Sequence, residues 1–195
     1  MPDEEAVTLR TDRASEPSPA EASSSSSLEP ASVLSLRLLA GLAATVVLLD
    51  QVTKAMVRAT LPLHESITVV PGLLDFTHVR NTGAAFGFLN AVDIPFKPVL
   101  MTTIALTALV AIGVFAVRTP SHEPMTRLGL AFVFGGATGN LIDRVAAGYV
   151  VDFVDVYWGN WHFWAFNVAD SAITIGAALL ILEMAIFNRH VPTTA

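Results

Sequence analysis

Four long runs of apolar residues constrain, more than any other feature, what this chain can fold into. We expect the corresponding helices at about residues 33–57, 98–117, 128–147 and 166–187. A helix that crosses a bilayer needs roughly 20 predominantly apolar residues, and each run reaches or approaches that length. Charged residues make up only 14% of the chain, against about 25% in average globular domains. The sequence therefore predicts a mainly α-helical membrane protein with four transmembrane helices.

The segment before the first apolar run, residues 1–32, is rich in Ser, Pro and acidic side chains. A segment of this composition buries too little apolar surface to offset its ordering entropy. We expect a disordered tail on the cytoplasmic side, followed by one integral membrane domain over residues 33–190. A cleavable signal peptide begins with basic residues and turns apolar at once, which this tail does not do. We therefore expect the first helix to be retained.

The connection between the first two runs, residues 58–97, has a different composition. Ser66–Val70 and Leu74–Val79 are rich in β-branched and aromatic residues, and Pro71-Gly72 separates them. Two such pieces divided by a turn signal predict a hairpin or a small sheet. We expect a β-rich cradle at the extracytoplasmic surface of the membrane.

The basic residues near the helix ends indicate the orientation, although their bias is weak. One side of the membrane receives Arg37, Arg118, Arg127 and Arg189, and the other receives Lys54, Arg58, Arg80, Lys97 and Arg144. Motifs described below, which mark a candidate functional site, account for basic residues of the second group on the extracytoplasmic side. We therefore place the first group, and with it both termini, in the cytoplasm.

Unusual polar residues gather where four crossings would share one face of the membrane. These places are the end of the first helix, the 58–97 connection, the end of the third helix and the start of the fourth. Ionisable groups at membrane depth cost roughly 2.5–3.5 kcal/mol each on insertion scales, so several together indicate a functional site. The residues are Asp50, Gln51, Lys54, Arg80, Asn81, Thr82, Asn140, Asp143, Arg144, Asp152, Asp155, Asn167, Asp170 and Ser171.

These polar residues also allow structural interpretations. Asp50 and Lys54 are four residues apart and can form an ion pair at a helix end. Asp152 can be the surface residue of a loop. Asn167 or Asp170 can cap the fourth helix at its N-terminus. Each cluster taken singly therefore leaves function open.

The third apolar run allows similar interpretations. Gly135 and Gly139 have the GxxxG spacing that permits close helix packing. Asn140 can hydrogen-bond between helices, and Asp143 with Arg144 can be a paired charge. None of these structural roles excludes a part in a site.

Two aspartates form the candidate catalytic pair. Asp152 follows the third helix and Asp170 opens the fourth, so both can face one cleft at the same depth. Two carboxyl groups in a partly desolvated site do not both ionise easily, and the pair titrates as a unit with one proton retained near neutral pH. Such a pair supplies a general base for water and a general acid for a scissile amide. These residues therefore favour aspartyl hydrolysis.

Other chemistries lack the residues they need. The chain has no cysteine, and no serine lies in a GxSxG motif. We expect no metal and no cofactor, because no HExxH motif pairs any histidine. No basic patch indicates nucleic acid. We interpret all five histidines as structural or surface residues: His64, His78, His122, His162 and His190.

Five motifs follow one another along the chain. They are DQVTK at residues 50–54, NTGAAFG at 81–87, GGATGNLIDR at 135–144, VDF at 151–153 and FNVADS at 166–171. Together they resemble the motifs of lipoprotein signal peptidase, also called signal peptidase II, over roughly residues 35–188. The long acidic, Ser-rich tail departs from the common pattern of that family and carries no motif.

The resemblance implies a membrane-embedded aspartic endopeptidase of the bacterial cytoplasmic (inner) membrane. Such an enzyme removes the signal peptide from prolipoproteins and cuts just before a diacylglyceryl-modified cysteine. The implied partners are prolipoproteins with that lipidated cysteine and the membrane lipid. Globomycin, a cyclic peptide antibiotic that targets the family, is the implied inhibitor.

The resemblance also implies roles for individual residues. Asp152 and Asp170 match the catalytic dyad. The positions that line or support the site are Asn81, Asn140, Asp143, Arg144 and Asn167, with Asp50 and Lys54 at a helix end and Gly83 and Ala84 beside the substrate.

An aromatic group lies between the third and fourth runs and allows two roles. It can anchor the connection at the level of the lipid headgroups, or it can form a lid over the substrate. Its members are Tyr157, Trp158, Trp161, Phe163 and Trp164.

Two other functions stay open on the residues alone. In a small carrier or proton-coupled translocator the same aspartates would bind ions near the midplane. The clustering of acids at one face and the uncharged second helix argue against this reading. A non-catalytic assembly factor would keep its function after Asp152→Asn, whereas a carrier would show ion flux in vesicles.

Overall fold

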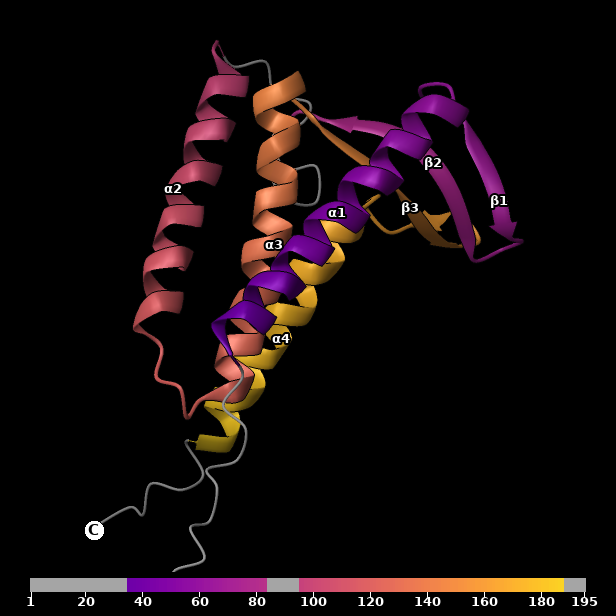
Figure 1. Ribbon diagram of the computed structural model, residues 1–195. Coiled ribbons are helices and arrows are strands. Elements are labelled where there is room, and N and C mark those ends of the chain that lie inside the picture. The colour runs from indigo at the N-terminus through magenta and orange to yellow at the C-terminus, as the bar shows by residue number, and fades with distance from the viewer. Residues whose placement is uncertain (1–34, 84–94, 188–195) are drawn as a thin grey trace, which may run out of the picture. The chain divides into compact units, whose positions relative to one another are not determined.

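The computed structural model (Figure 1) describes residues 35–83 and 95–187. In this part of the chain the elements are α1 (Leu36–Thr60), β1 (Ser66–Val70), β2 (Leu74–Asn81), α2 (Lys97–Arg118), α3 (Pro124–Ala147), β3 (Val150–Trp158), β4 (Trp161–His162) and α4 (Val168–Phe187). The expected tail at residues 1–32 and the site position Ala84 lie outside the described residues. The chain is mainly helical with a small antiparallel sheet, as the sequence predicts.

Local signals in the sequence set the helix ends. The Ser35 side chain caps α1 by accepting a hydrogen bond from the Leu38 backbone N–H (3.2 Å). Leu61 stands before a proline and is extended, which ends α1. Gly148 ends α3 in the left-handed region, with φ of 78°, and its N–H bonds the carbonyl of Arg144.

Helix α3 contacts each of the other three helices. Glycines allow the helix backbones to approach closely. A Cβ on Gly135 would lie only 2.9 Å from the Ala43 carbonyl oxygen in α1, which leaves no room for a side chain. A Cβ on Gly129 would lie 2.8 Å from the Gly176 carbonyl oxygen in α4. The packing interpretation of Gly135 is therefore confirmed. By contrast, α1 and α2 make at most marginal contact with each other.

The sheet contains two strands, β3 and β4, that lie outside the 58–97 connection in which we predicted strands. Its strand order is β1-β2-β3-β4, and each neighbouring pair is antiparallel. The sequence VVDFVDV at 150–156 is β-branched and partly alternating, yet we expected only a connection there. Pairing of β3 with β2 sets Asp152 opposite Val79 and Val150 opposite Asn81.

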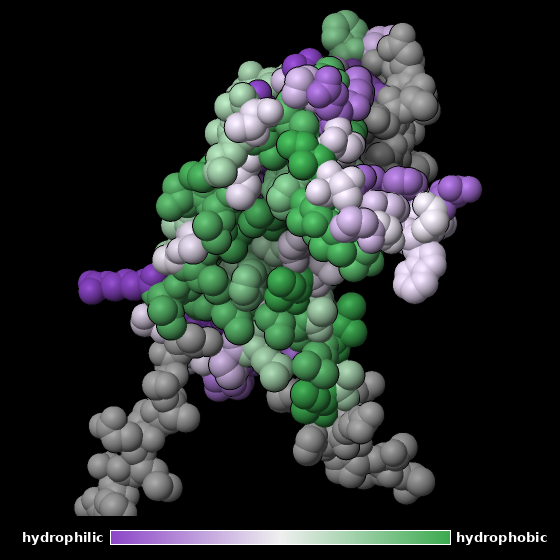
Figure 2. Space-filling view, turned by 90° about the vertical axis from the view of Figure 1, so that its right-hand side faces the viewer, coloured by the Kyte–Doolittle hydropathy of each residue, from purple (hydrophilic) through white to green (hydrophobic). Residues whose placement is uncertain are grey.

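Three helices are long and apolar enough to cross a membrane: Leu36–Thr60, Lys97–Arg118 and Val168–Ile186. Helix α3 falls outside this group, and it carries Asn140 and Asp143, which are buried among its neighbours. On the face drawn in Figure 2, hydrophobic side chains form a broad cover over the middle of the molecule. This surface suits a lipid environment.

Candidate active site

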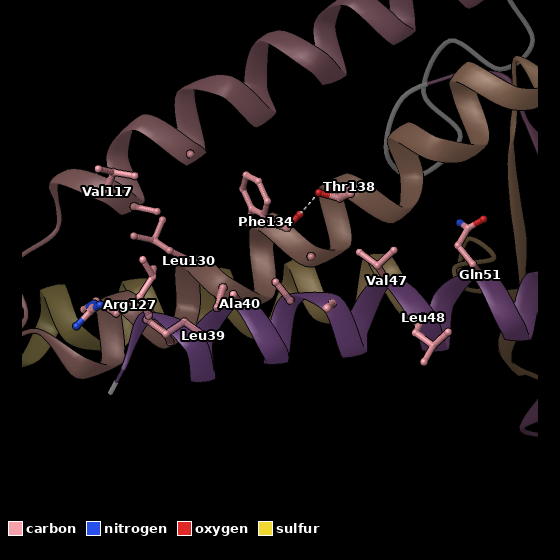
Figure 3. A pocket seen from close by; sticks show the side chains of 17 residues that line it. Leu39, Ala40, Val47, Leu48, Gln51, Val117, Arg127, Leu130, Phe134 and Thr138 are labelled. Atoms are coloured by element: carbon pink, nitrogen blue, oxygen red, sulfur yellow. Dashed lines mark hydrogen bonds between the residues drawn. The ribbon is translucent and has the colours of Figure 1, made fainter. Parts of the chain in front are cut away.

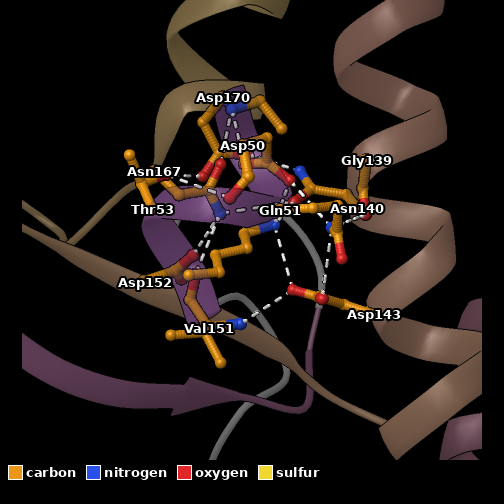
Figure 4. A network of polar contacts seen from close by, with 12 residues as sticks. Asp50, Gln51, Thr53, Gly139, Asn140, Asp143, Val151, Asp152, Asn167 and Asp170 are labelled. Carbon is orange, nitrogen blue, oxygen red and sulfur yellow. Dashed lines mark hydrogen bonds and ion pairs between the residues drawn. The ribbon is translucent and has the colours of Figure 1, made fainter. Parts of the chain in front are cut away.

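Asn167 connects the two candidate catalytic aspartates (Figure 4). Its side-chain amide donates to Asp152 Oδ1 at 2.7 Å, and its backbone N–H donates to Asp170 Oδ2 at 3.2 Å. In return, Asn167 Oδ1 accepts from the Asp170 backbone N–H at 2.9 Å. These reciprocal bonds form a capping box at the start of α4. The capping interpretation is therefore confirmed for Asn167, and the cap also orients both carboxyl groups.

Asp152 lies in β3 and is only 3% exposed, so its interpretation as a loop surface residue is wrong. It is buried because β3 joins the sheet and presents this side chain to the helices. Besides Asn167, the Asn81 side-chain amide donates to Asp152 Oδ2 at 3.1 Å. Burial, and next the negative charge of Asp170, raise the pKa of Asp152 to about 7. The carboxyl group thus changes protonation near neutral pH.

Asp170 lies in the first turn of α4 and meets α3 through Asn140. The Asn140 side-chain amide donates to Asp170 Oδ1 at 2.8 Å. The oxygen of the same Asn140 amide accepts from Lys54 Nζ at 2.9 Å and from Asn167 at 3.3 Å. Asn140 therefore joins the aspartate pair to a lysine of α1.

A buried ion cluster lies behind the aspartate pair. Lys54 is fully buried, and its Nζ is 2.8 Å from Asp50 Oδ2 and 3.0 Å from Asp143 Oδ2. The pair of Asp50 with Lys54 therefore forms as the four-residue spacing predicts, but in the interior and not at an exposed helix end. Ions in such a place are tolerated when they are paired and hydrogen-bonded.

Asp50 also binds the start of α4. Its Oδ1 accepts from the Ala169 backbone N–H at 2.9 Å. This N–H is one of the first groups of a helix, which have no partner within the helix. A carboxylate of α1 thus satisfies the helix terminus that carries Asp170, and the two helices are fixed relative to each other at the site.

Arg144 joins α3 to the segment that follows β2. Its Nη1 donates to the Asn140 carbonyl oxygen at 3.2 Å, and its Nη2 donates to the Gly83 carbonyl oxygen at 3.1 Å. The Gly83 N–H in turn donates to Asn81 Oδ1 at 3.0 Å. Arg144 therefore holds Gly83 near the aspartate pair. The sequence allowed Arg144 to be the charge partner of Asp143. In the structure Asp143 forms ion pairs with Lys54 and Arg58, and Arg144 bonds two backbone carbonyl oxygens.

Two further residues join this network: Gln51, which belongs to the DQVTK motif, and Arg58, which the sequence did not single out as a site residue. Gln51 donates to the Gly139 carbonyl oxygen at 3.1 Å and to Asp143 Oδ1 at 3.4 Å. Arg58 Nη1 is 3.6 Å from Asp143 Oδ1. Gln51 was among the unusual polar residues of the sequence, although no role was predicted for it. Arg58 gives no such signal, since basic residues are common at helix ends.

Gly139 allows Asp50 to reach its position. A Cβ at Gly139 would lie 2.6 Å from Asp50 Oδ2. We expect Gly139→Ala to displace this carboxylate from Lys54 and to lower the thermal unfolding temperature in detergent by several degrees. Gly41→Ala is the matched control, because nothing lies within 4 Å of its added Cβ. A Gly139→Ala protein as stable as the Gly41→Ala protein would contradict the close approach.

The arrangement supports acid–base chemistry between two carboxyl groups. Each carboxyl group is held by two N–H donors, which fixes its position without neutralising it. Within the described ranges, no group of three or more His, Cys, Asp or Glu side chains could hold a metal ion. Asp152 and Asp170 are therefore the candidate acid–base pair among the described residues.

Comparisons with known proteins agree with one another. A sequence profile of the family described as Signal peptidase (SPase) II matches residues 42–186. A lipoprotein signal peptidase of Nitratidesulfovibrio vulgaris (strain DP4) is 46% identical over 151 residues, which are 77% of this chain and 91% of that protein. A lipoprotein signal peptidase of Geobacter metallireducens is 47% identical over 136 residues, 70% of this chain and 83% of that protein.

Solved structures agree as well. A structure described as a bacterial membrane enzyme superposes with a TM-score of 0.72 at 32% identity, and covers 82% of this chain and 94% of its own. A second structure of the same description has a TM-score of 0.67 at 33% identity, over 76% of this chain and 93% of its own.

Proposed function

The chain belongs to the signal peptidase (SPase) II family of aspartic-type peptidases, and we propose that it cuts diacylglyceryl-modified prolipoproteins just before the lipidated cysteine. Family membership implies removal of signal peptides from prolipoproteins. The observation that supports the finer proposal is the pair of carboxyl groups bridged by Asn167, of which Asp152 is buried and Asp170 half-buried. It provides the two proton-transfer groups that amide hydrolysis by water requires.

In the proposed reaction, Asp152 holds the shared proton, because its raised pKa of about 7 favours the neutral form up to neutral pH. Asp170 takes a proton from water, and the water oxygen attacks the carbonyl carbon of the scissile amide. Asp152 gives its proton to the carbonyl oxygen, which yields a tetrahedral diol. Collapse of the diol returns a hydroxyl proton to Asp152 and breaks the C–N bond, and Asp170 protonates the leaving nitrogen. Both carboxyl groups end in their starting states.

The remaining candidate residues hold this pair in place. Asn81, Asn140 and Asn167 position the carboxyl groups by direct hydrogen bonds. Asp50, Lys54 and Asp143 brace them from behind through the buried ion cluster. We further propose that Arg144 holds Gly83 beside the substrate, and that Ala84 contributes to substrate binding.

The chain is a multi-pass membrane protein, given its apolar helices and its similarity to a membrane enzyme. We propose that α3 is the fourth crossing, since its polar side chains pack against other helices. Four crossings put both termini on one side of the membrane. We propose that this side is the cytoplasm, and that the sheet and the aspartate pair lie near the outer face of the inner membrane. The proposed domains are a cytoplasmic tail at 1–32 and a peptidase domain at 33–190, and globomycin is the proposed inhibitor.

The pKa of Asp152 predicts how cleavage depends on pH. A carboxyl group with a raised pKa keeps its proton at neutral pH and loses it as the pH rises through about 7. Above that pH both aspartates are ionised and the general acid is missing. We expect kcat/KM to fall by up to about tenfold per pH unit above pH 7. The measurement is cleavage of a diacylglyceryl-modified prolipoprotein in detergent between pH 5.5 and 9.

Asp155→Asn is the control for this profile, because Asp155 pairs with His162 in the same sheet. We expect its profile to match that of the unchanged protein. Cleavage that stays constant or rises up to pH 9 would argue against a shared proton on the pair.

A further inference from the structure

A set of exposed apolar side chains lies at the turns of the sheet, and the proposed reaction does not use it. One part belongs to the turn between β1 and β2, where Val69, Val70 and Leu73 are exposed. The other part belongs to the turn between β3 and β4, where Trp158 is 80% exposed and Trp161 is 62% exposed. We call these five side chains the apolar rim. Exposed apolar patches of this kind mark sites of contact with protein or lipid.

Tyr157 joins the two turns. Its backbone N–H donates to the Leu73 carbonyl oxygen at 2.9 Å, and its hydroxyl oxygen accepts from the Gly72 N–H at 3.1 Å. The His162 ring stacks on the Tyr157 ring, with 5.1 Å between the ring centroids. The sheet therefore holds both parts of the apolar rim together as one surface.

The chain around the apolar rim carries almost no charge. Residues 66–74 and 156–166 contain no Asp, Glu, Lys or Arg. His162 is the one imidazole in these two ranges, and its ring bonds Asp155 at 2.8 Å. Turns that face water are usually polar. Uncharged turns with five exposed apolar side chains suit a lipid surface instead.

The sheet lies beside the helices and not beyond their ends. Helix α3 ends level with the start of α2, because a Cβ on Gly148 would lie 3.5 Å from Pro98. Helix α4 begins nearer the middle of α3, since a Cβ on Gly139 would lie 3.5 Å from the Ala169 Cβ. Gly139 precedes the end of α3 at Ala147 by eight residues, or about 12 Å at 1.5 Å per residue. Strands β3 and β4 connect these two levels, and Figure 1 shows β3 running back from the end of α3 alongside α1.

The length of α2 relates this level to the bilayer. Its 22 residues span about 33 Å, slightly more than the hydrocarbon core of roughly 30 Å. Because α2 begins where α3 ends, one edge of the core lies near that level. Strands that run back from this level therefore meet the interfacial region of the membrane and not bulk water.

Exposed apolar surface also continues from the helices to the sheet. The apolar groove of about 680 Å³ between α1, α2 and α3 (Figure 3) begins at Leu36 and follows α1 to Gln51. Beyond the groove, Val52 and Met56 of α1 and Leu63 in the connection to β1 are exposed. The lipid that covers α1 is therefore the neighbour that the sheet meets.

We propose that the apolar rim inserts into the interfacial region of the outer leaflet, where it contacts phospholipid headgroups and the upper part of the acyl chains. Tryptophan and tyrosine favour this region, because their rings are apolar and their N–H or O–H groups form hydrogen bonds. Of the two roles that the aromatic group allows, this is the anchor and not the lid.

Strand β3 gives the lipid contact a consequence for the site. It carries Asp152 near one end and Trp158 at the other, six residues or roughly 20 Å apart at about 3.3 Å per residue. An anchor at Trp158 therefore sets the depth of Asp152 relative to the leaflet that holds the diacylglyceryl group of the substrate. This second part rests on the proposed function, whereas the lipid contact itself does not depend on cleavage.

Tryptophan fluorescence tests the lipid contact. The three tryptophans of the chain are Trp158, Trp161 and Trp164, so Trp161→Phe with Trp164→Phe leaves Trp158 as the single reporter. The full chain is reconstituted in bilayers whose phospholipids carry bromine either near the headgroup or near the tail of the acyl chains. We expect the strongest quenching from bromine near the headgroup, and only weak quenching by iodide in the water. Strong quenching by iodide alone would place Trp158 in water, and quenching by neither agent would place it against protein, as in a lid; either result overturns the proposal.

Cleavage in two media tests the consequence for the site. Trp158→Ser with Trp161→Ser removes both aromatic side chains of the rim, and Leu106→Ser is the matched control, because Leu106 is an exposed apolar residue of α2. In bilayers we expect kcat/KM of the rim variant to fall at least about fivefold, because a misplacement of about 1 Å can cost even more. In detergent, which has no leaflet of fixed depth, we expect the rim variant to cut like the unchanged protein. The control should cut like the unchanged protein in both media.

Two results would overturn the positioning part of the proposal. An equal loss in both media would show that the two tryptophans act on the fold or directly on the substrate. No loss in either medium would show that the apolar rim does not set the depth of Asp152. If the unchanged protein cuts a diacylglyceryl-modified prolipoprotein in neither medium, the proposed function fails, and the quenching of Trp158 alone decides the lipid contact.

Discussion

Replacing either Asp152 or Asp170 by asparagine should lower cleavage by at least about 10³-fold, the range expected when a general acid or base is lost. Asparagine keeps the shape of each side chain and can still bond Asn167 and Asn140, so the fold should persist. It can neither hold the shared proton nor accept one from water. The measurement is single-turnover cleavage of a diacylglyceryl-modified prolipoprotein, with thermal unfolding in detergent as the check on folding.

The aspartate variants have a matched control in the same strand. Asp155 lies three residues after Asp152 in β3 and bonds His162 at 2.8 Å, away from the aspartate pair. Asp155→Asn should cut at the rate of the unchanged protein. If a folded Asp152→Asn or Asp170→Asn protein kept near-normal cleavage, that aspartate would have only a structural role and the mechanism would need another general acid or base.

Lys54→Met should destabilise the protein by roughly 3–5 kcal/mol, the cost of leaving buried charges without their partner. Lys54 is fully buried between Asp50 and Asp143, and methionine fills a similar volume without the charge. For a chain of this size the loss corresponds to roughly 6–20 °C in the thermal unfolding temperature. Because Lys54 also bonds Asn140, which holds Asp170, cleavage should fall too.

Arg58→Met is the matched control for Lys54→Met. It removes a cation from the same Asp143 carboxylate, but the Arg58 side chain is 37% exposed and its closest approach is 3.6 Å. Such a pair contributes about 0–1 kcal/mol. Equal losses of stability in the two variants would show that the buried cluster is not specially dependent on Lys54.

The sequence predicted the helical part of the fold well, because hydropathy is a strong signal over 20 residues. Runs of apolar residues located all four helices, and Gly135 signalled the close packing of α1 on α3. The third helix begins at Pro124, ahead of the expected residue 128, because polar residues at its start hide the boundary from hydropathy. The number of membrane crossings stays a prediction, since α3 is not among the three helices that are apolar enough to cross alone.

The sheet was predicted only in part. The hairpin of β1 and β2 followed from composition and from Pro71-Gly72. Strand β3 was missed, because a short strand after a helix depends on a distant partner, here β2. That omission left Asp152 open to interpretation as a loop residue, although strand pairing is what buries it.

The site, like the sheet, could be predicted only in part. Motifs indicated which polar residues to consider, but spacing along the chain could not show that Asn167 bridges both aspartates. It also could not show that Asp50 accepts a hydrogen bond from Ala169 at the start of α4, since these two residues are 119 positions apart. Interactions between distant segments require the packed structure, and they are what position the carboxyl groups.

The position of the cut tests the central proposal most directly. The unchanged protein is purified in detergent and mixed with one prolipoprotein in two forms, with and without the diacylglyceryl group on its cysteine. Mass spectrometry then identifies both fragments. We expect a product that begins with the lipidated cysteine, and little or no cleavage of the unmodified form. Cleavage at another bond, equal cleavage of both forms, or no cleavage by folded protein supplied with lipid would contradict this proposal.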